Sequence, residues 1–332
     1  MKITMKRIAE ECGVSVATVS HVINGTKHIS EEKYRKITEV INKYHYVPHF
    51  SAKNLRQQRT KTAGLIVPSF PDSYVTGYIN GIGNRARELG YSLLFINTNE
   101  DSDYERETVN LLHSNMVDGI ILSPTSTHND YLQPYIDKNF PIVLLSRHDP
   151  KLTSLPWVTA DDYQAGYDAT LHLINHGHER IGVIYAVPDI SPTINRVEGY
   201  KAALSEYNIS YNEDYLAKGF ATVEGGEKAV ISLLKEQENL TALFILSDLM
   251  TIGAVAACKK LGLKIGEDIA IIGFGDFDSA KILDPPITNI SVSPDIIGKT
   301  AFDLLMNKIN NPKYNRHIQL PSSLVVRKSC GC

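Results

Sequence analysis

Residues 13–25 read GVSVATVSHVING, a stretch rich in β-branched residues that favour strands by propensity alone. No part of it alternates apolar and polar residues with a period of two, as a half-buried strand would. Val19, Val22 and Ile23 instead stand at i, i+3 and i+4, the spacing of one buried face of a helix. Ser15 is suited to cap that helix at its amino end. The stretch therefore predicts a short helix that ends at about Ile23.

The flanking sequence predicts one helix on each side of this stretch. The first spans residues 6–12, with Ile8 and Ala9 on its inner face. The third begins after Ser30, a candidate cap. Its expected core face comprises Tyr34, Ile37, Val40 and Ile41. Residues 1–47 are therefore expected to form a small domain of three helices.

Three residues in the first two helices have the spacing of a helix-turn-helix. Ala9 permits close approach of the helices, Gly13 suits the turn, and the β-branched Val19 fixes the second helix. The opposite face of the second helix carries side chains short enough for the major groove of DNA: Ser15, Val16, Ala17, Thr18, Ser20, His21 and Asn24. A protein-interaction module of three helices is the alternative that these residues alone leave open.

Charge is distributed unevenly along the chain. Residues 1–61 hold 12 Lys and Arg against 5 Asp and Glu, whereas the other 271 residues hold 22 against 32. A basic segment on an acidic body indicates that only the amino-terminal part meets a polyanion such as DNA. An ordinary solvated basic surface is the plainer interpretation of the same asymmetry.

From Thr62 onward, predicted strands alternate with helical stretches, which is typical of a parallel sheet. The expected strands are 63–69, 92–98, 118–124, 141–147, 156–161, 180–186, 242–248, 269–275 and 288–294. They exceed one comfortable doubly wound domain, so we expect two α/β subdomains side by side. Because such sheets bind ligands at the carboxyl ends of their strands, a cleft is expected there.

Composition argues against membrane and secreted proteins. No apolar run reaches the roughly 18–20 residues that span a bilayer, and the first residues lack the apolar core of a signal peptide. We therefore expect a cytoplasmic protein. The four scattered cysteines indicate reduced thiols rather than a disulfide framework: Cys12, Cys258, Cys330 and Cys332. The last two lack an accompanying His or Cys pair in the sequence, so no metal is expected.

Nothing in the sequence supports catalysis. GIGNRA at 81–86 matches a dinucleotide fingerprint, but it lies inside a helix that begins near Tyr74 instead of following a strand. HGHERIG at 176–182 lacks the second histidine of the zinc motif H-E-x-x-H. No nucleophile elbow is present either. We therefore expect neither an enzyme nor a cofactor.

Residues 4–47 resemble the LacI/GalR (lactose-repressor) family of bacterial transcription regulators, and TVSHVIN at 18–24 is most similar to its purine-repressor members. Four further segments follow in the family's order: NRVEGY (195–200), SDLMTIGA (247–254), IAIIGFGDF (269–277) and DPPITNISV (284–292). The resemblance covers essentially the whole chain.

That resemblance implies a division of the chain into three parts. A helix-turn-helix domain occupies 1–47, a hinge helix or linker 48–61, and a periplasmic-binding-protein-like core 62–332. Within the core we expect one subdomain of residues 62–160 and 290–318, and a second of residues 161–289 and 319–332.

The resemblance also implies which residues meet DNA. Phosphate contacts are expected from Thr4, Ser15, Thr18, Ser20, Asn24 and His28, and base contacts from Val16, Ala17 and His21. The hinge helix is expected to contribute Ser51, Ala52, Lys53, Leu55 and Arg56. Its leucine would unstack a central base step from the minor groove and kink the duplex.

For the effector, Arg196 aligns with the arginine that grips it in the family. Further candidates are Tyr74, Ser123, Arg147, Asp161, Phe220, Ser247, Asp248, Gly275 and Asp276. Gly275 replaces a common aspartate, and Ile190 aligns with the base-recognising arginine of purine repressors, so a purine is not expected. A neutral sugar is the plain expectation. An anionic sugar derivative is the alternative, because Arg147 and His148 remain where a carboxylate is lost.

The predicted function is a homodimeric, DNA-binding repressor of a carbohydrate-utilisation operon, controlled by a small molecule between the lobes. A dimer reads two half-sites, and its surface is expected to include parts of 74–115 and 278–285. A global catabolite-control regulator with a phosphorylated carrier protein as corepressor fits the same motifs. A periplasmic binding protein would need a signal peptide in place of residues 1–46.

Overall fold

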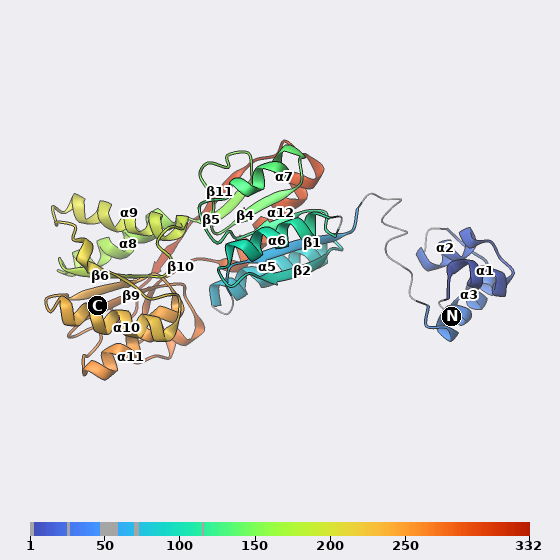
Figure 1. Cartoon of the computed structure of the whole chain (residues 1–332). Helices are drawn as coiled ribbons and strands as arrows, with labels where there is room; N and C mark the ends of the chain where they lie inside the picture. Colours follow the sequence, from blue (N-terminus) through green and yellow to red (C-terminus); the bar gives the residue numbers. More distant parts are fainter. Residues whose placement is uncertain (1–2, 25–26, 47–58, 70–72, 115) are drawn as a thin grey trace. The chain divides into compact units, whose positions relative to one another are not determined.

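The computed structural model describes residues 3–24, 27–46, 59–69, 73–114 and 116–332. The chain divides into two compact units, Met1–Arg59 and Thr60–Cys332, which Figure 1 colours along the sequence. The expected hinge residues Ser51, Ala52, Lys53, Leu55 and Arg56 lie outside the described residues.

The first unit contains the three predicted helices. They are α1 (Met5–Cys12), α2 (Val16–Asn24) and α3 (Glu31–Lys43). Gly13 ends α1 with a φ of 70°, and its N–H donates to the Glu10 carbonyl at 3.3 Å. Only glycine adopts this left-handed conformation without strain. Ser15 caps α2, because its Oγ accepts a hydrogen bond from the Thr18 N–H at 3.1 Å.

The core of this unit follows the predicted helical stripes with one exception. Ile8, Val19 and Ile37 are fully buried. Tyr34, which was expected on the same face of α3, is 53% exposed, so that prediction is wrong. A tyrosine at the edge of an apolar stripe can leave its ring in solvent because its hydroxyl is hydrated there. Ser30 precedes α3 as predicted, but its side chain makes no capping hydrogen bond.

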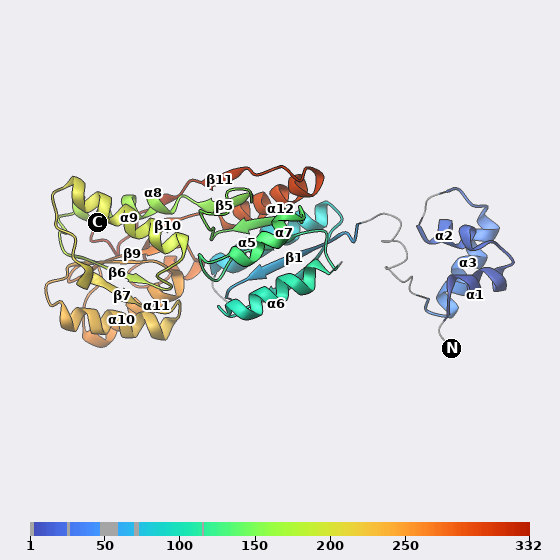
Figure 2. The ribbon, with the colours of Figure 1, turned by 45° about the horizontal axis from the view of Figure 1, so that its top comes forward.

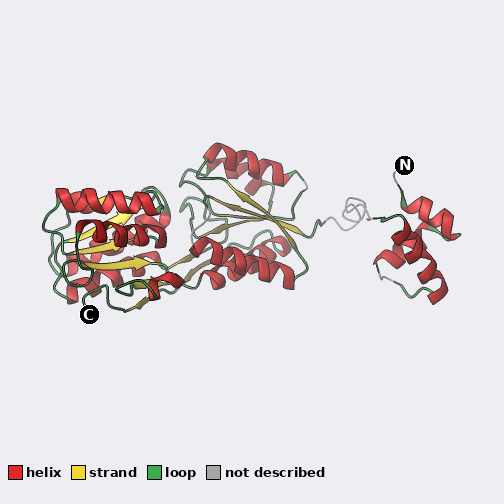
Figure 3. Ribbon diagram, turned by 90° about the horizontal axis from the view of Figure 1, so that it is seen from below, coloured by secondary structure: helices red, strands yellow, loops and turns green. Residues whose placement is uncertain are grey.

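The second unit begins with a six-stranded, parallel sheet in the order β11-β5-β4-β3-β1-β2, which we call the sheet of the first lobe. Its strands are β1 (Thr62–Val67), β2 (Ser92–Asn97), β3 (Ile120–Leu122), β4 (Ile142–Leu145), β5 (Trp157–Ala160) and β11 (His317–Leu320). Around it lie α5 (Ser73–Glu88), α6 (Ser102–His113), η1 (Asp130–Leu132), α7 (Gln133–Asp137) and α12 (Pro294–Asn310). Figure 3 shows helices on both faces of this sheet.

The second lobe holds another six-stranded sheet, in the order β12-β10-β9-β8-β6-β7, with only β12 antiparallel. Its strands are β6 (Ile181–Tyr185), β7 (Leu216–Lys218), β8 (Ala242–Ile245), β9 (Ala270–Phe274), β10 (Thr288–Ser291) and β12 (Ser323–Val325). Its helices are α8 (Asp162–Asn175), α9 (Ser191–Glu206), η2 (Glu213–Tyr215), α10 (Val223–Glu236), α11 (Asp248–Leu261) and η3 (Asp278–Lys281). In Figures 1 and 2, α8 and α9 cover one face of this sheet, and α10 and α11 the other.

All nine predicted strands are present within about three residues of their expected bounds, and the two-lobed α/β fold is confirmed. The sequence analysis missed β7, β11 and β12, which are short and only partly buried. The expected subdomain boundaries at 290 and 318 fall inside β10 and β11. Because β10 pairs within the sheet of the second lobe and β11 within that of the first, the chain passes from one lobe to the other after Ser291 and after Leu320. Each boundary lies two residues later than expected.

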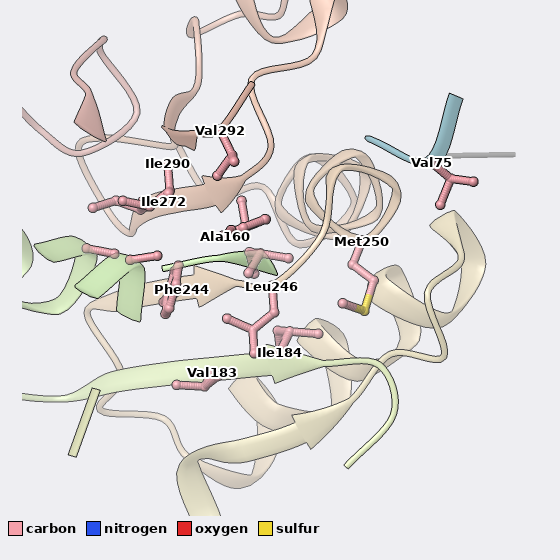
Figure 4. Packing of buried hydrophobic residues seen from close by; sticks show 14 of the residues in the cluster. Val75, Ala160, Val183, Ile184, Phe244, Leu246, Met250, Ile272, Ile290 and Val292 are labelled. Atoms are coloured by element: carbon pink, nitrogen blue, oxygen red, sulfur yellow. The ribbon is translucent and has the colours of Figure 1, made fainter. Parts of the chain in front are cut away.

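Apolar side chains from neighbouring strands fill the second lobe. Val183 of β6, Phe244 of β8 and Ile272 of β9 are fully buried and stand in register on neighbouring strands, and all three are labelled in Figure 4. Each such side chain stabilises the fold by roughly 1.5–3 kcal/mol relative to an exposed one. The near-continuous apolar runs in these strands follow from burial on both faces of a parallel sheet.

α5 runs through GIGNRA without interruption, and of its two glycines Gly81 serves packing, as predicted, whereas a Cβ atom on Gly83 would meet nothing within 4 Å, so the prediction is wrong there. A Cβ atom on Gly81 would lie 2.2 Å from the carbonyl oxygen of Asp295, at the start of α12. The segment therefore lacks the strand-to-helix turn that a dinucleotide fingerprint requires.

The cysteines differ from the expectation of four separate thiols. Cys12 and Cys258 are buried and free. Cys330 and Cys332 are joined as a disulfide. Gly331, with a φ of 81°, turns the chain so that both sulfur atoms lie on one side. The wide spacing of the cysteines in the sequence favoured free thiols, and it did not predict a disulfide between two cysteines separated by a single residue.

Candidate functional site

The exposed face of α2 carries the short side chains expected to read DNA. Ser15, Ala17 and Val16 are exposed, the last by 43%. Thr18, Ser20 and His21 are partly buried on the same helix. The Ser15 and Thr18 hydroxyl oxygens are 2.9 Å apart, so each is positioned by the other. The helix thus presents two methyl-bearing side chains and a row of polar groups within reach of a groove.

Two further predicted phosphate contacts lie outside this helix. Thr4 is exposed and caps α1, accepting a hydrogen bond from the Arg7 N–H at 3.3 Å. His28 is exposed in the segment between α2 and α3. Asn24 is the last residue of α2, and its side chain lies outside the described set. An N-cap hydroxyl at a helix terminus is a favourable position for a phosphate oxygen.

A cavity of about 100 Å³ lies where strands of both lobes end. The described residues that line it are Pro68, Ser69, Tyr74, Val75, Tyr78, Ser123, Ser146, Arg147, Ala186, Ile190, Pro192, Thr193, Arg196, Ala221, Leu246, Ser247, Asp248 and Phe274. About half of them follow the carboxyl ends of β1, β3, β4, β6 and β8, and most of the others lie in α5 and α9. The cavity therefore occupies the position where parallel α/β sheets bind ligands.

Arg196 of α9 is buried beside the cavity and held on three sides. Its Nε donates to one carboxylate oxygen of Asp162 at 2.8 Å, and its Nη2 forms an ion pair with the same oxygen at 2.7 Å. Its Nη1 donates to the Leu246 carbonyl at 2.8 Å. The guanidinium carbon lies 3.3 Å from the centroid of the Phe274 ring. A guanidinium has five N–H groups, and two of them make these hydrogen bonds, so N–H groups of Nη1 and Nη2 remain for a ligand.

The partner of this arginine is itself buried. Burial raises the pKa of Asp162, and the adjacent guanidinium opposes that rise. Asp162 begins α8 directly after β5, one residue beyond the predicted Asp161. The two charges compensate each other, so Arg196 offers hydrogen bonds to a ligand without a net positive charge at this point.

Arg147 is paired in the same way on the first lobe. Its Nη1 and Nη2 donate to the two carboxylate oxygens of Glu100 at 2.9 and 2.7 Å, in a bidentate arrangement. Nearby His148 stacks on Trp157 with ring centroids 4.6 Å apart. Burial, followed by the neighbouring His317, lowers the pKa of His148, which favours the neutral ring. His148 therefore supplies no positive charge for an anionic ligand.

Asp248 joins the two lobes across the cavity. Its Oδ2 accepts hydrogen bonds from the Ser73 N–H, at 2.9 Å, and from the Ser73 hydroxyl. Ser73 begins α5 of the first lobe, whereas Asp248 begins α11 of the second. A second link runs from the His148 N–H to the Ser191 hydroxyl at 3.0 Å. A ligand that uses Asp248 must therefore compete with the contact between the lobes.

The charged side chains around the cavity leave an excess of one negative charge among the described residues. Arg196 is balanced by Asp162, and Arg147 by Glu100. Asp248, only 5% exposed, faces the cavity with no cation among its hydrogen-bond partners. This arrangement favours hydroxyl groups, which donate to a carboxylate and accept from a guanidinium.

Six predicted effector residues line the cavity: Tyr74, Ser123, Arg147, Arg196, Ser247 and Asp248. Four others lie outside its lining. Asp161 caps α8 through the Gln164 N–H at 3.1 Å, and Phe220 is 64% exposed. Gly275 follows β9 with a φ of 88°, and Asp276 forms an ion pair with Arg327 at 2.7 Å.

Sequence reasoning missed several residues of this site. Asp162 at the start of α8 and Glu100 in the turn after β2 are the partners of the two arginines, and both are distant from them in the sequence. Phe274, which stacks on Arg196, was assigned only to a strand. The repeated aspartate at 161–162 directly after a strand was the available signal for the first of these. No sequence pattern near Glu100 or Phe274 indicated that these residues belong to the site.

The family models match the two units separately. Residues 4–49 match the model described as bacterial regulatory proteins, lacI family. Residues 60–328 match periplasmic binding proteins and sugar binding domain of LacI family. The chain belongs to the LacI family. This LacI-family chain is a DNA-binding transcription regulator, as the helix-turn-helix and the two lobes indicated.

Relatives of similar length support this assignment. The chain is 32% identical to the HTH-type transcriptional repressor PurR of Pasteurella multocida over 329 residues, covering 98% of each chain. It is 31% identical to the NTD biosynthesis operon regulator NtdR of Bacillus subtilis, covering 98% of this chain and 99% of the relative.

Solved structures show the same architecture. A complex of the transcriptional regulator CelR with cellobiose superposes with a TM-score of 0.76 at 27% identity, covering 98% of this chain and 99% of that one. A LacI family regulator from Enterococcus faecium with bound ribose gives 0.71 at 25% identity, covering 81% and 98%. The lac repressor dimer bound to operator gives 0.89 at 23% identity over the full length of both chains, a likeness of fold. No helix in the described parts of this LacI-family chain is long and apolar enough to cross a bilayer.

Proposed function

We propose that this LacI-family chain is a cytoplasmic, homodimeric repressor of a carbohydrate-utilisation operon, and that its effector is a neutral sugar. The observation that carries the proposal is the charge balance of the cavity. Both arginines are compensated, and the carboxylate of Asp248 remains. An anionic ligand would meet this carboxylate with no uncompensated cation nearby among the residues that the structure describes, which is costly in a desolvated site.

A neutral sugar matches the remaining hydrogen-bonding groups. Its hydroxyls can accept hydrogen bonds from the remaining N–H groups of Arg196 and can donate to Asp248. Tyr74 and Phe274 contribute apolar ring surface to the same cavity, and the two rings meet edge to face with centroids 6.3 Å apart. Apolar ring faces and a few convergent polar groups are the usual composition of a small-molecule site. The relatives in complex with cellobiose and ribose support this class of ligand.

The proposed control passes through the contact between the lobes. A sugar hydroxyl at Asp248 replaces or reinforces the hydrogen bonds from Ser73, and so changes the preferred separation of α5 and α11. A ligand acts on such an equilibrium only through its different affinity for the two arrangements. Residues 51–56 would transmit the change to DNA as a hinge helix, whose Leu55 unstacks a base step.

The proposed DNA contacts are those of α2 and its surroundings. Val16, Ala17 and His21 would touch base edges, while Thr4, Ser15, Thr18, Ser20, Asn24 and His28 would hold phosphates. The exposure of the α2 face supports this assignment. The relatives are transcription regulators, so we propose that the chain acts by binding and carries no catalytic activity.

A homodimer accounts for exposed apolar side chains on the predicted dimer surface. Leu111, Tyr104 and Ile282 are 58%, 47% and 84% exposed. They lie in or beside the predicted segments 74–115 and 278–285, and a second copy would cover them. Pairing also gives two copies of α2, as two half-sites require.

A purine effector and a global catabolite-control role are the two alternatives to this proposal. A purine is disfavoured because Ile190, which lines the cavity, offers no hydrogen-bonding atom to a base. The relatives reported above are the transcriptional repressor PurR and the NTD biosynthesis operon regulator NtdR, so they favour a pathway-specific repressor over a global catabolite-control regulator.

A thermal-shift panel tests the proposal. The full chain would be heated with neutral mono- and disaccharides, their phosphates, and hypoxanthine or guanine. Stabilisation by a neutral sugar, lost in Arg196→Lys, supports the proposed site, because lysine cannot reproduce the hydrogen bonds of the guanidinium to Asp162 and Leu246. Stabilisation only by phosphorylated sugars or purines would overturn it.

A further inference from the structure

Away from the cavity, His172 of α8 and His176, the residue that caps the end of α8, lie against the cysteine pair near the carboxyl terminus, in the part of the second lobe marked C in Figure 2. His172 and His176 are one turn apart, with ring centroids separated by 4.4 Å. The Nε2 atom of each lies 3.2 Å from the Cys332 sulfur. The sequence offered Cys330 and Cys332 without a histidine pair, and the fold supplies that pair from 156 and 160 residues away.

The donor atoms are close enough for one ion. Single ligand atoms of His172, Cys330 and Cys332 all lie within 4.8 Å of one another. In a tetrahedral zinc site, with bonds of about 2.3 Å to sulfur and about 2.0 Å to nitrogen, the donors lie roughly 3.3–3.8 Å apart. His176 reaches the same sulfur from the adjacent turn and completes four donors.

The tautomer of His176 is fixed for metal binding. Its Nδ1 lies 2.8 Å from the backbone oxygen of His172, and a carbonyl oxygen can only accept, so Nδ1 carries the hydrogen. The lone pair of Nε2 therefore points at the Cys332 sulfur. A thiol or a metal ion satisfies that lone pair, whereas a disulfide sulfur has no hydrogen to donate. A histidine held by a backbone carbonyl is typical of metal sites.

The sulfur of Cys330, the more buried of the two cysteines, accepts a hydrogen bond from a neighbouring side chain. Cys330 is fully buried, and the Thr288 hydroxyl lies 3.2 Å from its Sγ. That hydroxyl oxygen already accepts a hydrogen bond from the Arg327 N–H at 2.8 Å, so its hydrogen is free to be donated to the sulfur. A hydrogen bond of this kind stabilises a thiolate, the form that binds metals.

We propose that, in the reduced protein, His172, His176, Cys330 and Cys332 bind a zinc-class divalent ion. Two sulfur and two imidazole donors in a tetrahedral arrangement select zinc, whereas calcium and magnesium require oxygen ligands. The two thiols lose their protons on binding, and the ion replaces the sulfur–sulfur contact. The ion joins α8 to the carboxyl-terminal tail, and so stabilises the second lobe as a cross-link between distant parts of the chain.

Titration of the reduced full-length protein with Co(II) tests this site. Cobalt takes the place of zinc and absorbs visible light when thiolates surround it tetrahedrally. We expect these bands to saturate at one ion per chain, to disappear on addition of Zn(II), and to accompany a rise in the midpoint of thermal unfolding. The variants Cys332→Ser and His172→Ala/His176→Ala should lose the bands.

Two variants serve as matched controls. His178→Ala removes a nearby histidine that instead contacts Thr241 at 3.0 Å, and Cys258→Ser removes a buried free thiol. Both should keep the cobalt bands. Reduced protein with four titratable thiols and no cobalt bands would overturn the proposal and leave a disulfide alone at this position. Unchanged bands in the double histidine variant would also overturn it.

Discussion

The two candidate binding surfaces of this molecule are organised in opposite ways. The α2 face presents short side chains to solvent, on a helix held by the Ser15 cap and the buried Val19. The cavity presents long charged side chains that already have partners inside the protein. A ligand at α2 therefore adds contacts to an open surface, whereas a ligand in the cavity must match two arginines whose charges are already balanced and the remaining carboxylate of Asp248.

The largest contrast is expected between the two arginines of the cavity. Arg196→Ala leaves the buried Asp162 without its cation, which should lower the free energy of unfolding by about 3–5 kcal/mol. Arg147→Ala should cost about 1 kcal/mol or less, because its partner Glu100 is 34% exposed in its side chain. Urea unfolding of both variants measures the difference. Equal losses would show that Asp162 is not more dependent on its partner than Glu100.

The open surface is tested by a charge on α2. Ala17→Glu places a carboxylate against DNA and should weaken operator binding by about 2–3 kcal/mol, roughly 30- to 150-fold. Tyr34→Glu puts the same charge on the exposed start of α3 and is the control. Fluorescence anisotropy with operator DNA, identified by footprinting on the chain's own promoter, gives both affinities. If the control loses as much affinity, the effect is general repulsion and α2 is not the reading helix.

In the cavity, the smaller change Asp248→Asn removes only the uncompensated charge. A neutral sugar should lose about 1.5–3 kcal/mol of binding, roughly 10- to 150-fold, because hydrogen bonds to charged groups are the strong ones. Its phosphate should bind the variant better than the unaltered chain. Isothermal titration with the sugar found in the thermal-shift panel measures both. A variant that binds the neutral sugar normally would exclude Asp248 as a ligand.

The smallest expected effect separates two serines at helix starts. Ser15→Ala should destabilise its helix by about 1 kcal/mol, since the hydroxyl accepts from the Thr18 N–H. Ser30→Ala should cost clearly less, because Ser30 makes no such bond. Hydrogen exchange of the α2 and α3 amides, without DNA, measures the two. Equal effects would mean that the Ser15 cap is not what holds α2.

The sequence predicted the helical unit well because its determinants are local. Gly13, Ser15 and Val19 act within one or two turns, so spacing alone located the turn, the cap and the buried stripe. Tyr34 was misplaced because burial at the edge of a stripe depends on the packing of neighbouring helices.

The cavity was only half predictable because its determinants are long-range. Arg196 could be aligned with the family, but its partner Asp162 lies 34 residues away and becomes adjacent only when α8 packs along α9. The short strands β11 and β12 have no clear apolar pattern and are recognisable only from their pairing with β5 and β10. The histidines beside Cys332 are a further instance, since no local motif joins them.

The central claim is that a neutral ligand in the cavity controls the affinity with which α2 binds its operator. The most direct measurement is the operator affinity of the full chain with a neutral sugar and, separately, with the phosphate of the same sugar. We predict that the neutral sugar changes the operator Kd and that the change is lost in Asp248→Asn. A change produced by the phosphate, with none produced by the neutral sugar, would contradict the account.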